Sequence, residues 1–127
     1  MLSSAPVYAQ LPIVDVGRAK KFYQEKLGLK LVQEVGDMGV LIFEAGNGTR
    51  IELFQSDPPK SGDTAASFKV SDLEGEMKNL RAKGVAFEEY DMPPIKTVNG
   101  VCTIGDQKCS WFKDSEGNVL CLNQRGK

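Results

Sequence analysis

The sequence of 127 residues contains no histidine. Histidine is the commonest general base near neutral pH and the commonest protein ligand of transition metals. Catalysis by an imidazole of this chain is therefore excluded, and any metal site would have to use carboxylates, thiolates or other oxygen donors. This absence restricts the possible chemistry more than any other feature of the composition.

Other missing features exclude further classes of protein. The formal net charge is -1 and no basic run is present, so we expect neither nucleic acid nor a membrane as a partner. No stretch approaches the roughly 18 apolar residues that would cross a bilayer. The first residues also lack the charged start and apolar run of a secretory signal. We therefore expect a cytoplasmic protein.

The cysteines fit the same expectation. There are three of them, Cys102, Cys109 and Cys121, and an odd number makes a poor disulfide framework. Hydrophobic residues make up 41% of the chain and charged residues 26%, proportions typical of a globular protein with one core.

The chain is predicted to repeat one order of elements. A linker by composition, residues 56–63, separates two segments that each begin with a strand followed by a helix. In the first segment the strands are expected at residues 7–14, 29–34, 40–44 and 50–55, with a helix from about 16 to 27. In the second they are expected at 65–70, 85–89, 100–104, 108–113 and 119–123, with a helix ending before Gly84.

The predicted helix ends support this internal repeat. Asp15 and Asp72 are candidate N-caps and lie 57 residues apart, while Gly28 and Gly84 follow the helices and lie 56 apart. We therefore expect a single domain over residues 1–127 with two β-α-β-β-β modules, at about 5–57 and 63–125. The predicted fold class is α+β, with a curved mixed sheet, helices on its convex face and a concave ligand cleft.

The alternation of residues along the strands favours such a cleft. One predicted face is entirely apolar, as a face covered by helices requires. The other is mixed, and a binding surface and a face open to bulk solvent both remain possible for it. The mixed face collects Tyr8, Gln10, Arg50, Glu52, Phe54, Ala65, Ser67, Lys69, Cys121 and Asn123.

Motifs at both ends of the chain carry a resemblance to a known family. The first half contains Leu-Pro-Ile-Val-Asp-Val at residues 11–16, a helix with Phe22-Tyr23, and Leu27-Gly28-Leu29; the last hairpin contains Phe-Lys-Asp-Ser-Glu-Gly-Asn at 112–118. This pattern resembles the vicinal oxygen chelate superfamily, which includes glyoxalase I, bleomycin-resistance proteins and extradiol dioxygenases. The resemblance covers nearly the whole chain and implies the fold, but one fold supports many functions.

The resemblance also implies where a metal would bind. Metal-dependent relatives take His, Gln or Glu ligands from four positions, which correspond here to Tyr8, Glu52, Ala65 and Cys121. Only Glu52 is a ligand of that kind, and alanine offers no donor atom. A first-row dication needs about three protein ligands, so we expect no metal and no other cofactor. A site made of Glu52, Tyr8 and Cys121 is the alternative.

The candidate ligand-binding residues are aromatic, charged and thiol side chains on the mixed face. Tyr8, Phe54 and Trp111 would suit stacking on a planar organic ligand. The turn at residues 114–118 should set Trp111 opposite Cys121, although core packing is an equally open interpretation of the indole. The full set is Tyr8, Arg50, Glu52, Phe54, Lys69, Trp111 and Cys121.

Several of these residues have a plainer interpretation. Glu52 is either a base or ligand acceptor, or a carboxylate paired with Arg50 or Lys69. Cys121 is either a reactive thiol or a small semi-buried residue, and the lack of histidine favours the second. The acidic run at residues 88–91 is interpreted as a solvated strand end, and Phe22 with Tyr23 as core.

Three functions remain open. The first is a metal-independent small-molecule binding protein similar to the bleomycin-resistance branch, acting without catalysis. The second is an enzyme, either a degenerate lyase or isomerase of the glyoxalase I type or one that uses Glu52 with Cys121. The third is a regulatory or protein-interaction module. We expect a small organic ligand, which the sequence does not identify, and a homodimer, the commonest oligomer symmetry.

Overall fold

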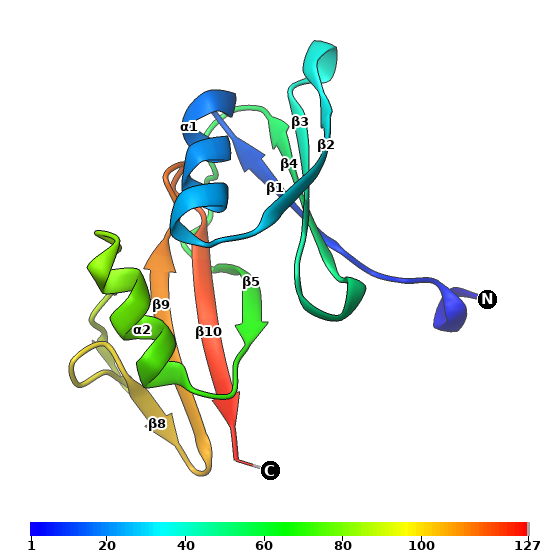
Figure 1. Ribbon diagram of the computed structural model, residues 1–127. Coiled ribbons are helices and arrows are strands. Elements are labelled where there is room, and N and C mark those ends of the chain that lie inside the picture. Colours follow the sequence, from blue (N-terminus) through cyan, green and yellow to red (C-terminus); the bar gives the residue numbers. More distant parts are fainter. Residues whose placement is uncertain (127) are drawn as a thin grey trace. The chain divides into compact units, whose positions relative to one another are not determined.

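The computed structural model describes residues 1–126 as two compact units, Met1–Lys60 and the chain from Ser61 onward (Figure 1). Each unit holds one β-α-β-β-β module with its own mixed four-stranded sheet. The predicted α+β class with two related modules is therefore confirmed. Among the described residues, no helix is long and apolar enough to cross a membrane.

The first unit forms a sheet with the strand order β1-β4-β3-β2. Strands β1 and β4 are parallel, and the other neighbours are antiparallel. The predicted bounds of the third and fourth strands are confirmed, whereas the first is shorter than expected and leaves Tyr8 outside it. The elements are η1 Leu2–Ser4, β1 Ala9–Ile13, α1 Val16–Lys21, η2 Phe22–Lys26, β2 Lys30–Val35, η3 Gly36–Met38, β3 Val40–Glu44, η4 Gly46–Gly48 and β4 Arg50–Gln55.

The second unit repeats this arrangement with the order β5-β10-β9-β8. Its first and last strands, β5 and β10, are again parallel, and the other neighbours are antiparallel. The internal repeat of the sequence therefore has a direct counterpart in the strand order. The elements are β5 Thr64–Lys69, α2 Leu73–Ala82, β6 Asp91–Met92, β7 Ile95–Lys96, β8 Cys102–Ile104, β9 Gln107–Lys113 and β10 Val119–Arg125.

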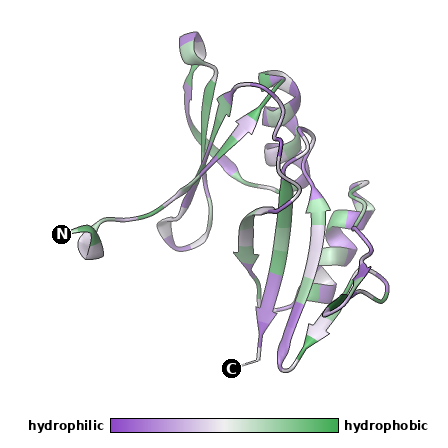
Figure 2. Ribbon diagram, turned by 180° about the vertical axis from the view of Figure 1, so that it is seen from behind, coloured by the Kyte–Doolittle hydropathy of each residue, from purple (hydrophilic) through white to green (hydrophobic). Residues whose placement is uncertain are grey.

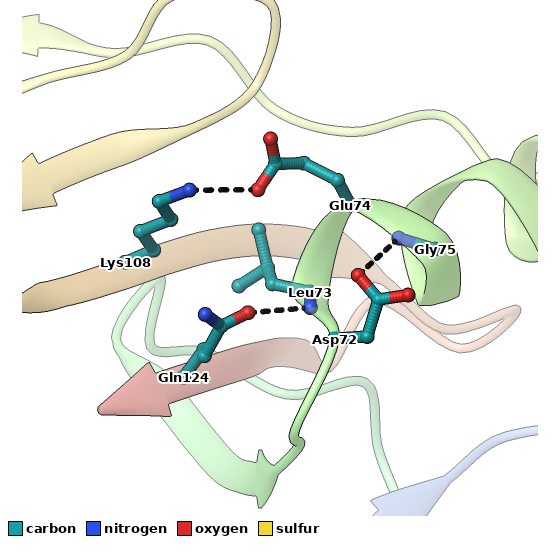
Figure 3. Close-up of polar contacts among 6 residues, drawn as sticks. All are labelled: Asp72, Leu73, Glu74, Gly75, Lys108 and Gln124. Carbon is teal, nitrogen blue, oxygen red and sulfur yellow. Dashed lines mark hydrogen bonds and ion pairs between the residues drawn. The ribbon is translucent and has the colours of Figure 1, made fainter. Parts of the chain in front are cut away.

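Both helices begin and end as the sequence predicted. The Asp15 carboxylate accepts a hydrogen bond from the backbone N–H of Arg18 at 2.9 Å. The Asp72 carboxylate accepts one from the N–H of Gly75 at 3.1 Å (Figure 3). Each bond satisfies an N–H that the first helical turn leaves without a partner. Gly28 and Gly84 adopt φ values of 70° and 90°, the left-handed region that glycine occupies at little cost.

The first helix changes its winding before it ends. α1 continues into a π-helical turn, η2, in which the N–H of Leu27 donates to the carbonyl of Phe22 at 3.2 Å. Phe22 and Tyr23 lie on this turn and are buried, and Tyr23 stacks on Phe43 with ring centroids 5.5 Å apart. The prediction that both rings belong to the core is confirmed.

The strand predicted at residues 85–89 does not form. Only one isolated bridge, between Phe87 and Phe112, joins this segment to the sheet, although the N–H of Glu88 also donates to the carbonyl of Trp111. Strand β8 pairs with the same edge of β9 further along, at Gln107–Cys109. The chain instead forms the short hairpin of β6 and β7, and the strand predicted from Gly100 begins at Cys102, because Gly100 adopts a φ of 82°.

Helix α2 covers one face of the second sheet. The N–H of Leu73 donates to the Gln124 side chain at 2.8 Å, and Lys108 pairs with Glu74 at 2.9 Å (Figure 3). Gln124 and Lys108 are register partners on β10 and β9, so both lie on the face that α2 covers. Side chains alternate along a strand. The opposite face, called the distal face below, therefore carries Ser67, Lys69, Cys109, Trp111, Lys113, Cys121, Asn123 and Arg125.

The central strand β10 changes character along its length. Its first four residues are hydrophobic and its last three are polar or charged, as the colours of its ribbon show (Figure 2). The hydrophobic part includes Leu120 and Leu122, which are buried on the side of α2. The predicted apolar face of this strand is thereby confirmed.

Ser110 is expected to be a weak point of the core. Its hydroxyl lies on the α2 side of β9, is fully buried and has no hydrogen-bond partner among the described residues. A buried hydroxyl without a partner costs about 1–3 kcal/mol. Ser110→Ala is therefore expected to raise the free energy of unfolding, by about 1 kcal/mol, in urea titrations. A loss of stability in this variant would show that the hydroxyl has a partner.

Candidate functional site

Two aromatic side chains meet at the distal face of the second sheet. Tyr90 and Trp111 pack edge to face with their ring centroids 5.4 Å apart, a favoured geometry for aromatic pairs. The indole N–H of Trp111 donates to the Thr64 hydroxyl on β5 at 3.1 Å. Trp111 itself is half-buried. The indole is thus held from two sides while part of its surface remains accessible.

The hairpin between β9 and β10 sets the position of Trp111. One Asp114 carboxylate oxygen accepts from the backbone N–H groups of Glu116 and Asn118 at 2.8 and 2.9 Å. The other accepts from the Asn118 side chain at 2.9 Å. This turn fixes the register in which Trp111 lies opposite Cys121. The predicted juxtaposition of these two residues is confirmed.

Tyr90 is a residue that the sequence analysis missed. The run at residues 88–91 was interpreted as a solvated strand end, but Tyr90 is half-buried against Trp111. Burial raises the pKa of the Tyr90 hydroxyl, and the negative charge of Glu88 raises it further. The available signal was one aromatic residue in an acidic run, and it gave no indication of which strand the ring would contact.

The neighbouring Glu89 holds this segment in place. Its carboxylate accepts hydrogen bonds from the Thr97 hydroxyl and from the N–H of Gly100. These two bonds, the Thr97 bond first, lower the pKa of Glu89. The Thr97 hydroxyl also accepts from the N–H of Tyr90 at 2.8 Å. The carboxylate therefore has a structural role in fixing the backbone beneath the aromatic pair.

Cys121 is a buried thiol. Burial raises its pKa to about 11, and the adjacent Cys109 contributes to the rise. A thiol with this pKa stays protonated at neutral pH, whereas a nucleophilic cysteine needs a lowered pKa. All three cysteines are free, and the Cys109 sulfur accepts from the side chains of Gln107 and Asn123 at 3.2 Å. The interpretation of Cys121 as a small buried residue is supported.

Glu52 in the first unit has a different partner from the one expected. The Gln10 side chain donates to its carboxylate at 3.3 Å, and the two residues face each other in the register of β1 and β4. Within the first unit no ion pair joins Glu52 to Arg50. The alternative that paired Glu52 with Arg50 is therefore wrong, whereas Lys69 belongs to the second unit, and a pairing with it stays a prediction. The amide of Gln10 lies directly opposite Glu52 on the neighbouring strand β1, whereas Arg50 lies on the same strand as Glu52.

The remaining candidate residues are mostly exposed. Tyr8 precedes β1 with 47% of its surface exposed, and Phe54 on β4 is 37% exposed. Arg50 and Phe54 lie on the same side of β4 as Glu52, because they are two residues away from it. In the second unit Lys69 is register partner to Asn123, which lies two residues along β10 from the pair of Cys121 and Trp111.

The residues at the four positions of a family metal site do not fit a divalent ion. Ala65 has no donor atom, Cys121 is a protonated thiol, and Tyr8 is a phenol outside the strand. Only Glu52 offers a carboxylate. Throughout residues 1–126, no three His, Cys, Asp or Glu side chains are grouped so that they could hold an ion. About three such ligands are needed for a first-row dication.

Comparisons with known proteins agree with this fold. The family profile described as "Glyoxalase/Bleomycin resistance protein/Dioxygenase superfamily" matches residues 6–122. No curated protein matches the chain by sequence.

Solved structures share the fold at low sequence identity. The fosfomycin resistance protein FosX from Listeria monocytogenes is 16% identical with a TM-score of 0.72, covering 97% of this chain and 92% of its own. A putative glyoxalase family protein from Bacillus anthracis is 16% identical with a TM-score of 0.71, covering 99% and 100%. The protein SMU.1112c is 20% identical with a TM-score of 0.74, covering 94% and 98%.

Proposed function

This chain belongs to the glyoxalase/bleomycin resistance protein/dioxygenase superfamily, and we propose that within it the protein binds a small planar organic molecule without a metal ion. The observation that carries the proposal is the Tyr90–Trp111 pair, whose indole is anchored to Thr64. A rigid, partly accessible aromatic surface beside polar groups is the usual composition of a specific small-molecule site.

Binding is favoured over catalysis by the protonation states of the available groups. The chain has no histidine, and the thiol of Cys121 has a pKa near 11. No imidazole base is therefore available beside Trp111, and the Cys121 thiol is not an activated nucleophile. One structure of the Listeria FosX is a complex with Mn(II), whereas in this chain only Glu52 offers a carboxylate at the four family positions.

Loss of the indole is expected to weaken ligand binding. With a planar aromatic ligand found by thermal-shift screening, Trp111→Ala should raise the dissociation constant by about 5- to 150-fold, which corresponds to roughly 1–3 kcal/mol. Thr64→Val keeps the indole but removes its hydrogen bond, and should cause a smaller loss. Calorimetric titration measures both. Met38→Ala, at an exposed side chain of the first unit, is the control, and equal affinity in all variants would contradict the proposal.

Purified protein is expected to contain no stoichiometric divalent metal. Elemental analysis should find well below one Mn, Fe, Ni or Zn per chain, and added metal should not raise the melting temperature, because only Glu52 is a suitable donor at the four family positions. About one ion per chain, lost in Glu52→Ala, would refute metal-independent binding.

A further inference from the structure

We infer that the ligand is an aromatic acid, with its ring against Trp111 and its anionic group directed to Lys69. This inference rests on the proposed function and adds the chemical class of the ligand. It depends on the charges of the distal face and on the order of side chains along β5.

The distal face carries an excess of unpaired positive charge. Lys69, Lys113 and Arg125 are exposed there, and none of them forms an ion pair with another described residue. One carboxylate on this side is Glu88, whose charge acts on Tyr90. On the α2 side, by contrast, Lys108 is paired with Glu74. Unpaired cations attract an anionic ligand and repel a cationic one.

Two polar side chains of β5 lie at increasing distance from the indole. Trp111, Cys121 and Ser67 are register partners across β9, β10 and β5, and Lys69 is two residues further along β5. Two residues of a strand span roughly 7 Å. The indole is tied to Thr64 at the other end of β5. A ring stacked on the indole would thus meet the exposed Ser67 hydroxyl first and the Lys69 ammonium next.

A ligand can approach the indole of Trp111 only from the side of β10 and β5, where Thr64 holds its N–H but covers no more of the ring than that. Tyr90 packs edge to face against the indole, and its chain segment lies beside β9 on the side away from β10. Lys69 lies on β5, across β10 from Trp111, whereas Lys113 lies on Trp111's own strand at the hairpin. We therefore assign the anionic group to Lys69.

The test compares two probes that differ in charge. 2-Naphthoate and its neutral amide, 2-naphthamide, are titrated while the emission of Trp111, the only tryptophan, is recorded. We expect naphthoate to bind at least about tenfold more tightly at low salt, with an advantage that shrinks as salt is added. Lys69→Gln should remove most of that advantage and leave naphthamide binding unchanged. Lys78→Gln, an exposed lysine on α2, is the matched control.

The outcomes separate this inference from the proposed function. Equal affinity for the two probes, no effect of Lys69→Gln, or no saturable naphthoate binding at millimolar concentration would overturn the aromatic-acid assignment. If either probe still binds through Trp111, as shown calorimetrically by weaker binding to Trp111→Ala, the proposed function remains. If Trp111→Ala binds both probes as tightly as the unmodified protein, the site itself is wrong.

Discussion

Replacement of Phe112 by alanine is expected to lower the free energy of unfolding by about 3–5 kcal/mol. Phe112 is fully buried on β9 beneath α2 and lies opposite Leu120 in the register of β10. Its ring also packs edge to face against Phe87, with centroids 5.5 Å apart. Truncation would therefore create a cavity and remove an aromatic pair.

The same substitution at an exposed ring provides the control. Phe54 is 37% exposed, so Phe54→Ala should cost roughly 1 kcal/mol or less. Urea unfolding measures both changes, with one value for the dependence of the unfolding free energy on urea concentration in all variants. If Phe112→Ala does not fold, Phe112→Leu should still cost more than Phe54→Leu. Equal losses at the two positions would show that β9 is not packed beneath α2.

Native Cys121 is expected to react with iodoacetamide at pH 8 at least about a hundredfold more slowly than in the unfolded chain. Its pKa rises from 9.0 to about 11, chiefly through burial and then through Cys109. A rise of about two pKa units lowers the thiolate fraction roughly a hundredfold, and only the thiolate reacts. Peptide mass spectrometry distinguishes Cys121 from the other two cysteines. Similar rates in the native and unfolded states would contradict this burial.

The raised pKa also has a consequence for stability. Between pH 9 and pH 11 the native state keeps a proton on Cys121 that the unfolded state releases. The stability from this group is therefore complete below pH 9 and is lost as the pH rises through the native pKa near 11. Cys121→Ala should have a shallower decline of the urea midpoint over this range. If the urea midpoint of Cys121→Ala declines as steeply as that of the unmodified protein, the loss of stability comes from other groups, such as Tyr90.

Local signals predicted the helices and turns well. Asp15 and Asp72 cap the helices through their own side chains, and Gly28 adopts a backbone angle that few other residues tolerate. Such features depend on neighbours in the sequence, so a sequence pattern contains them. The strand expected at residues 85–89 does not form, because its pairing is set by distant segments rather than by neighbours in the sequence. Its pairing depended on which segment reached the edge of β9, and β8 pairs there with Gln107–Cys109.

The candidate site shows the same division. The juxtaposition of Trp111 and Cys121 follows from a short turn, so it could be predicted from residues 114–118. The contact between Tyr90 and Trp111 joins segments 21 residues apart through an irregular stretch of chain, and no periodic pattern indicates it. The partner of Glu52 was missed because the register of β1 with β4, which places Gln10 opposite, depends on distant segments.

In both modules the parallel strand pair joins the first strand to the last, and this has a consequence for folding kinetics. Ala9 pairs with Ile51 and Thr64 with Val119, separations of 42 and 55 residues, whereas the hairpins close locally. Contacts between distant residues form slowly, so we expect the hairpins to form first and the parallel pairing to limit the rate. The two loop lengths differ by only about 0.2 kcal/mol in closure entropy. The modules should therefore close at comparable rates.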